Sequence, residues 1–170
     1  MPNEETKGRF ARVAKLFAAY GVEYIVIGGV AESLMGSPRP TFDIDLCHRR
    51  TPENLKRLAK ALKELHPTLR GAPPDLPFIL DAKSLALGNN FMFQTDVEAL
   101  DLLGHVEPIG DYEALLDRAE VVDFVGESIK IISIDDLIRV KEHINRPKDQ
   151  DSLFQLRAIK QVREEQGGRG

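Results

Sequence analysis

Cysteine is almost absent from this chain of 170 residues, and tryptophan is missing altogether. One cysteine, Cys47, cannot form an internal disulfide bond, and such low usage is typical of proteins from a reducing compartment. With one cysteine and four scattered histidines, the chain shows no spacing typical of a zinc site. Any metal ion bound here is therefore expected to have oxygen ligands.

Long apolar runs are also absent, since none approaches the roughly 20 residues that a membrane helix needs. The first residues, Met1 to Glu5, are acidic and lack the apolar core of a signal peptide. We therefore expect a cytoplasmic protein with no membrane partner. The length and the ordinary share of 42% hydrophobic residues predict one domain over residues 1–165, followed by a disordered tail over residues 166–170.

Basic residues are fewer than acidic ones, and the net charge is −4. The basic residues are nevertheless concentrated in one segment. Residues 48–70 hold seven basic residues against two acidic ones, which gives this segment a net charge of +5. The basic residues are Arg49, Arg50, Lys56, Arg57, Lys60, Lys63 and Arg70. Such a segment can steer a polyanion such as RNA toward a nearby site. It can equally be the solvated face of a helix, and the sequence leaves both interpretations open.

The hydrophobic pattern predicts helices interspersed with short strands. Helices are expected over residues 3–20, 30–35, 52–62, 112–118, 134–144 and from 147 onward. Strands are expected over residues 24–27, 42–47, 91–94, 97–103, 121–125 and 128–132. Residues 67–77 contain four of the ten prolines and are expected to form a long loop, at the mouth of a cleft if there is one.

A strand that ends in a glycine pair is the first candidate for a functional site. The apolar run Tyr24–Ile27 is followed by Gly28 and Gly29 and then by a short predicted helix. Backbone N–H groups at such a turn can bind an anion, helped by the helix dipole. Ser33, one helical turn further on, can add a hydroxyl to the same phosphate seat. Most glycine pairs are ordinary turns, so this pattern alone does not identify a site.

Two carboxylates alternate along the next predicted strand. Asp43 and Asp45 lie two residues apart, so they point to the same face, about 6.6 Å apart along the chain. Carboxylates so placed repel one another unless a cation lies between them. Mg²⁺ suits such a pair, because it takes one or two carboxylates together with phosphate oxygens. The alternative is a solvent-facing strand whose polar side happens to be acidic.

Two further charges fall on faces that are otherwise apolar. In the segment Val97–Leu103, Asp101 shares a face with apolar side chains, and a charge in that position needs a partner. Metal-binding aspartates nearby could supply one through the ion, and so could an arginine. Lys141 lies on the apolar stripe of the helix predicted over 134–144, where its ammonium either extends out of the core or meets a triphosphate or a carboxylate in a cleft.

Together these residues resemble the nucleotidyltransferase superfamily, whose signature is Gly-Gly or Gly-Ser, a spacer, Asp-x-Asp and a third acid on a later strand. Here 13 residues separate Gly29 from Asp43. The nearer match is to the minimal AbiEii-type nucleotidyltransferases, known as toxins of toxin–antitoxin pairs. The stretches that carry this match are residues 39–45, 93–103, 133–141 and 145–149. Ser152 is a departure, because the family often has a further aspartate at that place.

The resemblance implies an α+β nucleotidyltransferase (polymerase β-like) fold, a mixed twisted sheet flanked by helices. It implies transfer of an NMP from an NTP to an acceptor hydroxyl, dependent on Mg²⁺ or Mn²⁺. The implied metal ligands are Asp43, Asp45 and Asp101, which form the catalytic set with Lys141. The implied nucleotide-binding residues are Gly28, Gly29, Ser33, Arg39, Thr41 and Lys141.

The resemblance also bears on partners. RNA, including tRNA, is the favoured acceptor and would approach through residues 48–70, and an antitoxin protein is the expected partner of a toxin. The alternative is a non-catalytic regulator or antitoxin that binds a nucleotide or a protein on the same fold. Against this alternative, a site without catalysis has no physical reason to keep three mutually repelling carboxylates.

Overall fold

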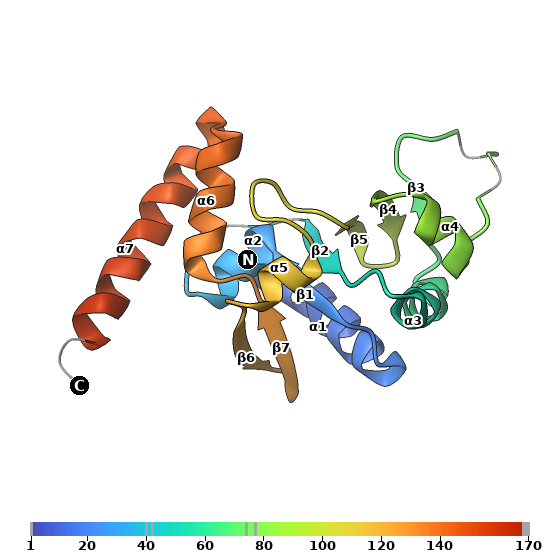
Figure 1. Ribbon diagram of the computed structural model, residues 1–170, viewed down its shortest axis with the longest axis horizontal. Helices are drawn as coiled ribbons and strands as arrows, with labels where there is room; N and C mark the ends of the chain where they lie inside the picture. The colour runs from blue at the N-terminus through green and yellow to red at the C-terminus, as the bar shows by residue number, and fades with distance from the viewer. Residues whose placement is uncertain (1, 40, 42, 74, 77, 168–170) are drawn as a thin grey trace.

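A seven-stranded mixed sheet forms the centre of the computed structural model, which describes residues 2–39, 41, 43–73, 75–76 and 78–167. The strands are β1 (Tyr24–Ile27), β2 (Ile44–His48), β3 (Thr68–Leu69), β4 (Asn90–Thr95), β5 (Glu98–Leu103), β6 (Glu120–Phe124) and β7 (Glu127–Ile131). The helices are α1 (Pro2–Tyr20), α2 (Gly28–Leu34), α3 (Pro52–Lys63), α4 (Ala82–Leu87), α5 (Tyr112–Leu116), α6 (Ile134–Ile144) and α7 (Gln150–Gly167), with a 3-10 turn η1 (Pro147–Asp149) before α7. Across the sheet the order is β3-β4-β5-β2-β1-β7-β6 (Figure 1).

The central strands run in both directions, and this brings distant residues together. Strand β2 pairs antiparallel with β1 and parallel with β5, while β1 pairs parallel with β7. The outer pairs β4–β5 and β6–β7 are antiparallel hairpins. As a result, Asp45 of β2 lies opposite Asp101 of β5 on one side and opposite Ile27, the last residue of β1, on the other.

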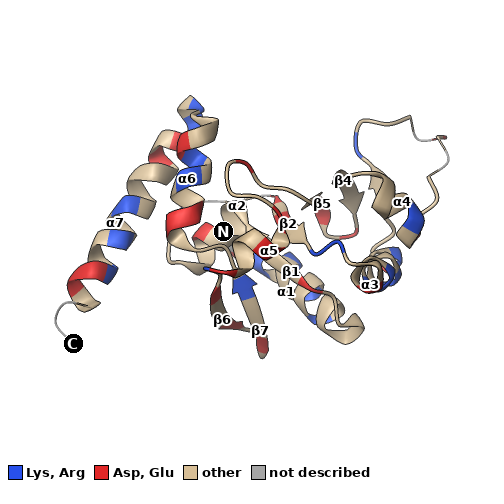
Figure 2. Cartoon of the chain, in the orientation of Figure 1, with Lys and Arg blue, Asp and Glu red and all other residues tan. Residues whose placement is uncertain are grey.

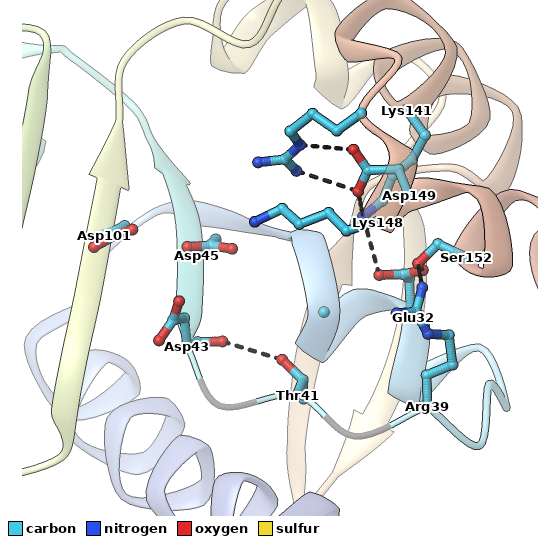
Figure 3. Close-up of a pocket in the computed structure, with 12 residues that line it drawn as sticks. Glu32, Arg39, Thr41, Asp43, Asp45, Asp101, Lys141, Lys148, Asp149 and Ser152 are labelled. Atoms are coloured by element: carbon cyan, nitrogen blue, oxygen red, sulfur yellow. Dashed lines mark hydrogen bonds and ion pairs between the residues drawn. The ribbon is translucent and has the colours of Figure 1, made fainter.

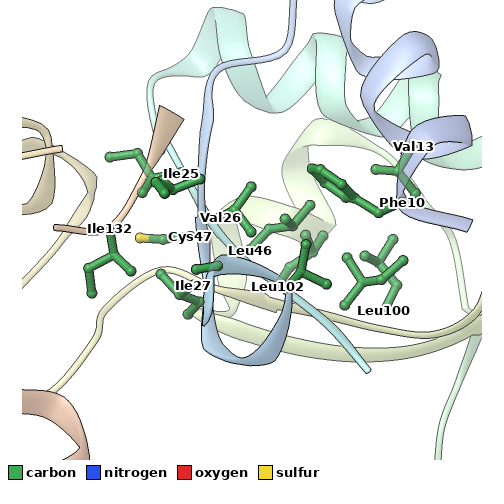
Figure 4. Packing of buried hydrophobic residues seen from close by; sticks show 14 of the residues in the cluster. Phe10, Val13, Ile25, Val26, Ile27, Leu46, Cys47, Leu100, Leu102 and Ile132 are labelled. Carbon is green, nitrogen blue, oxygen red and sulfur yellow. The ribbon is translucent and has the colours of Figure 1, made fainter. Parts of the chain in front are cut away.

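The main core lies on the face of the sheet away from these aspartates. Ile44, Leu46, Leu100 and Leu102 alternate with the acidic positions and are fully buried. Phe10 of α1 lies close to Leu46 and Leu100 (Figure 4). Burying one such leucine contributes roughly 1.5–3 kcal/mol, so the alternation determines which face of β2 and β5 can carry carboxylates.

Local capping signals fix the starts of two helices, of which α6 borders the site. Thr51 and Ser133 cap α3 and α6, and each side chain accepts a hydrogen bond from the backbone N–H three residues on. Asn145 adopts the left-handed conformation at the end of α6. The chain then turns through η1 into α7, and residues 146–152 come to lie beside α2.

Most predicted elements are present, with ends that differ by a few residues. Residue 42, the predicted start of a strand, lies outside the described residues, and β2 begins at Ile44. Two elements were missed: α4 has six residues, too few to show a helical period, and β3 is a two-residue strand inside the predicted loop 67–77. Residues 166 and 167, predicted as tail, are the end of α7, and residues 168–170 are outside the described range.

Within the described residues, no helix is both long and apolar enough to span a membrane.

Candidate active site

A polar cleft of about 350 Å³ lies between strands β2 and β5 on one side and helices α2, α6 and the start of α7 on the other (Figure 3). Its lining residues are Gly29, Glu32, Arg39, Thr41, Asp43, Asp45, Asp101, Lys141, Arg146, Lys148, Asp149 and Ser152. Seven of the nine predicted site residues are among them. Of the other two, Gly28 lines an adjoining cavity, whereas Ser33 is 7% exposed and lines neither.

Three carboxylates form one side of the cleft, here called the acid wall: Asp43, Asp45 and Asp101. Asp45 and Asp101 are in register on neighbouring strands, and Asp43 precedes Asp45 by two residues (Figure 3). Burial, the charge of Asp101 and then that of Asp43 raise the pKa of Asp45 to about 7. The acid wall therefore holds negative charge that is unfavourable until a cation joins it.

Asp101 also has the arginine partner that the sequence allowed as an alternative. The guanidinium of Arg70, from the loop after β3, forms an ion pair with the Asp101 carboxylate. Asp101 thus adjoins a second aspartate and pairs with an arginine at the same time. Arg70 was not predicted as a site residue, because nothing local indicates that a residue of a proline-rich loop reaches this strand.

The glycine pair makes room for the chain's own side chains. Gly28 has a φ of +68°, and a Cβ there would collide with the Asp45 carboxylate. A Cβ at Gly29 would collide with the side chain of Thr41. The two positions therefore need glycine for close packing of the acid wall and its preceding loop. Sequence reasoning had considered an anion seat or an ordinary turn here, and not this close packing.

The opposite side of the cleft, here called the basic wall, consists of Arg39, Lys141, Arg146 and Lys148. Two of these four cations, Lys141 and Arg146, are neutralised by buried acids. The Nζ atom of Lys141, whose side chain is 13% exposed, lies 3.3 Å from an Asp149 oxygen and 3.5 Å from a Glu32 oxygen. Lys141 therefore meets carboxylates, one of the outcomes that the sequence had left open.

Asp149 and Glu32 are buried acids that the basic wall surrounds. Arg146 contacts Asp149 at 2.7 Å. Burial opposes ionisation of Asp149, but hydrogen bonding from Arg146 and the charge of Lys141 outweigh it and lower its pKa. Asp149 is thus placed as a counter-ion that orients Lys141.

Ser152 connects Glu32 to the loop before the acid wall. Its hydroxyl donates to the Glu32 carboxylate and accepts a hydrogen bond from Arg39 Nη1 at 2.6 Å. A carboxylate from α2 therefore adjoins the serine that departs from the family pattern. Sequence reasoning missed Glu32, although an acid within the short apolar helix predicted over residues 30–35 was an available signal.

Lys148 differs from Lys141 and Arg146 of the basic wall. Its side chain is exposed, lines the cleft and extends toward the acid wall (Figure 3). Among the described residues it has no ion pair or hydrogen bond. The sequence included it only within the stretch 145–149 that carries the family resemblance.

The basic segment 48–70 contributes little to this cleft. Arg49 pairs with two glutamates, and Arg50 donates to carbonyl oxygens of α4. The lysines of α3 are exposed to solvent at the end of the molecule away from α6 and α7 (Figure 2). Of the segment's cations within the described residues, Arg70 is the one that contacts an acid-wall carboxylate.

The cleft continues into a second cavity of about 320 Å³ that shares Gly29, Asp45, Asp101, Lys141 and Arg146 with it. The remaining lining is largely apolar and includes Ile27, Met92, Leu103, Val106, Leu137, Val140 and Ile144. A polar cleft joined to an apolar cavity is the arrangement expected for a ligand with a charged part and an apolar part.

The acid wall has the chemistry of a magnesium site without being a closed cage. In the described ranges of the chain, no three acidic, histidine or cysteine residues converge into a ready ligand group. Mg²⁺ does not require one, because it is commonly held by one or two carboxylates, water and substrate phosphates. The repelling carboxylates therefore fit Mg²⁺ or Mn²⁺ that binds together with a nucleotide.

Several solved structures are similar to this one. LnuA, a lincosamide antibiotic adenylyltransferase, aligns over 89% of this chain and 96% of its own, with a TM-score of 0.61 and 13% identity. The antibiotic-resistance factor ANT(2'')-Ia aligns over 94% and 84%, with a TM-score of 0.61 and 14% identity. An antigenic nucleotidyltransferase-like protein from Paracoccidioides brasiliensis aligns over 94% and 75%, with a TM-score of 0.52 and 18% identity.

No protein-family model and no curated protein sequence matches the chain. At 13–18% identity the shared property is the fold. The fold predicted from the glycine turn and the spaced aspartates is confirmed. The chain has the α+β nucleotidyltransferase, or polymerase β-like, fold.

Proposed function

We propose that this protein is a Mg²⁺-dependent nucleotidyltransferase that moves an NMP from an NTP to an acceptor hydroxyl and releases pyrophosphate. The observation that carries the proposal is the pairing of the two walls across one cleft. Asp43, Asp45 and Asp101 repel one another on one side, and cations stand on the other. A metal–triphosphate complex has the positive and negative groups that this arrangement lacks.

The acid wall would hold one or two Mg²⁺ or Mn²⁺ ions through Asp43, Asp45 and Asp101. A bound ion supplies neutralisation of the triphosphate and polarisation of the α-phosphorus. Asp101 borders the apolar cavity, so its carboxylate is suited to orient an acceptor hydroxyl and to accept its proton. Thr41 donates from Oγ1 to the carbonyl oxygen of Asp43 at 3.4 Å, which supports a role in orienting the acid wall.

The triphosphate is assigned to the glycine turn and the basic wall. Lys148 is assigned the main contact with the leaving pyrophosphate, because its ammonium is not already neutralised. The charge of Lys141 is shared between two buried acids, so Lys141 holds the wall in shape and presents a smaller net charge. Arg39, held by Ser152, can join it.

RNA, with tRNA included, remains the acceptor we favour, and the AbiEii-type resemblance adds the role of a toxin with a cognate antitoxin. The support for RNA now comes from Arg70 beside Asp101 rather than from the lysines of α3. A small-molecule hydroxyl is the second candidate. The apolar cavity of about 320 Å³ favours it, since small-molecule pockets begin at about 300 Å³.

Transfer of label from each α-labelled NTP to total RNA, to total protein and to a panel of hydroxyl-bearing small molecules, with Mg²⁺ present, tests the proposal. We expect label on RNA from the wild type and none from Asp43→Asn. Asp123→Asn, which changes an exposed acid on β6, is the matched control and should label as the wild type does. Equal labelling by Asp43→Asn and the wild type would rule out this mechanism.

A further inference from the structure

Four residues form a row across the sheet at the edge of the cleft: Arg70, Met92, Asp101 and Asp45. The backbone N–H of Arg70 donates to the carbonyl oxygen of Met92 at 2.8 Å. Met92 lies opposite Asp101, and Asp101 lies opposite Asp45. Side chains of directly opposed residues point to the same face of a sheet, so the row faces the cavity that Met92, Asp101 and Asp45 line.

Arg70 and a metal ion at the acid wall compete for one carboxylate. The Arg70 side chain is 33% exposed and pairs with Asp101, whose side chain is 16% exposed. A divalent ion bound to Asp101 would stand next to the guanidinium, and two cations at one carboxylate repel one another. Because the backbone of Arg70 is anchored to β4, release requires movement of the side chain alone.

We propose that Arg70 neutralises Asp101 in the metal-free site, leaves it when a divalent ion binds, and then binds a phosphate group of an RNA acceptor. This inference rests on the proposed function, because it needs both the metal ion and an acceptor in the cleft. A guanidinium matches a phosphate through two parallel hydrogen bonds. Met92, 53% exposed between Arg70 and Asp101, offers an apolar surface to the neighbouring sugar or base.

A purely structural role for Arg70 makes a different prediction. If the ion pair only fastened the loop after β3 to the sheet, replacing Arg70 would alter stability and metal affinity and leave acceptor binding unchanged. The two roles are therefore separated by measuring metal and RNA binding on the same variants.

Metal binding is measured first, by calorimetry with Mn²⁺ and a non-hydrolysable analogue of the NTP that supports labelling. Arg70→Ala should bind Mn²⁺ about two- to fivefold more tightly than the wild type, since one competing ion pair is removed. Arg12→Ala is the matched control, because Arg12 forms a similar pair with Asp96 at 3.6 Å outside the cleft. Unchanged Mn²⁺ affinity in Arg70→Ala would overturn the inference. Absence of Mn²⁺ and nucleotide binding by the wild type would instead overturn the proposed function.

RNA binding is then measured by fluorescence anisotropy with a short single-stranded RNA, with and without Mn²⁺ and the analogue. Addition of Mn²⁺ and the analogue should tighten RNA binding by the wild type about three- to tenfold more than RNA binding by Arg70→Ala. Asp101→Asn removes the carboxylate partner of Arg70 even without metal, so this variant should bind RNA more tightly than the metal-free wild type. The double variant Arg70→Ala/Asp101→Asn should lose this gain in RNA affinity. The proposal would be overturned if Mn²⁺ and the analogue tightened RNA binding equally in the wild type and Arg70→Ala. It would also be overturned if Arg70→Ala weakened binding of a hydroxyl acceptor without phosphate as much as it weakened binding of RNA.

Discussion

The two walls of the cleft carry similar amounts of charge in opposite physical states. On the basic wall, Lys141 and Arg146 are paired with buried acids. On the acid wall, burial and two neighbouring carboxylates raise the pKa of Asp45 to about 7. The paired part of the basic wall is internally satisfied, and the acid wall is short of positive charge.

This difference separates a scaffold from a reactive surface. Breaking a buried ion pair leaves an uncompensated charge and is strongly destabilising, so the paired part of the basic wall, Lys141 and Arg146 with their acids, should be rigid and intolerant of change. Repelling carboxylates are relieved by loss of a charge or by gain of a cation. Changes to the acid wall should therefore abolish activity while sparing, or even raising, the stability of the metal-free fold.

The largest expected effect is on catalysis from the acid wall. Asp43→Asn should lower kcat/KM for NMP transfer by about a thousandfold or more, equivalent to about 4 kcal/mol of transition-state stabilisation. The fold should persist, because Asp43 has no ion pair with any residue that the structure describes. The measurement is steady-state transfer at saturating Mg²⁺, with Asp123→Asn as the control. Activity within about tenfold of the wild type would show that the acid wall does not hold the catalytic ion.

The next largest effect is the difference between replacing Lys148 and replacing Lys141. Lys148→Ala should lower kcat/KM by about tenfold to a hundredfold at unchanged stability, since an unpaired ammonium is lost from the cleft. Lys130→Ala, on β7 outside the cleft, serves as a charge-matched control. If Lys148→Ala behaves like Lys130→Ala, the assignment of Lys148 to the triphosphate is wrong.

Lys141→Met should mainly affect stability, by about 3 kcal/mol in urea denaturation, because Glu32 and Asp149 lose their shared cation. The second variant, Lys141→Met/Glu32→Gln, removes one of the stranded charges and should recover part of the loss. No recovery in the double variant would mean that Glu32 and Lys141 are not energetically coupled.

Period-two alternation made Asp43 and Asp45 recognisable from the sequence, because it is a local property of a strand. Their alignment with Asp101 was not predictable in that way, since it depends on the parallel pairing of β2 with β5. Lys141 was recognised as an anomaly on an apolar stripe. Its partner Glu32 lies over a hundred residues away, and such tertiary ion pairs leave no periodic signal. Arg70 was hidden for the same reason, within a stretch expected to be a loop.

The smallest effect is the most specific test of the difference between the walls. The pKa of Asp45 is raised in the fold, so its favourable contribution is present at low pH and is lost as the pH rises through about 7. Without metal, Asp45→Asn should therefore melt at about the wild-type temperature at pH 4 and about 5 °C above it at pH 8, or about 2 kcal/mol.

Adding Mg²⁺ with the NTP analogue at pH 8 should raise the melting temperature of the wild type and have little effect on Asp45→Asn. The acid wall is relieved by a cation in the first protein, whereas the second has lost a ligand. Thermal melts of both proteins at several pH values, with Asp123→Asn as the reference, provide the comparison. A difference between Asp45→Asn and the wild type that shrinks as the pH rises would show that the acid wall is not strained by its own charge. The two walls would then differ in composition and not in how they store free energy.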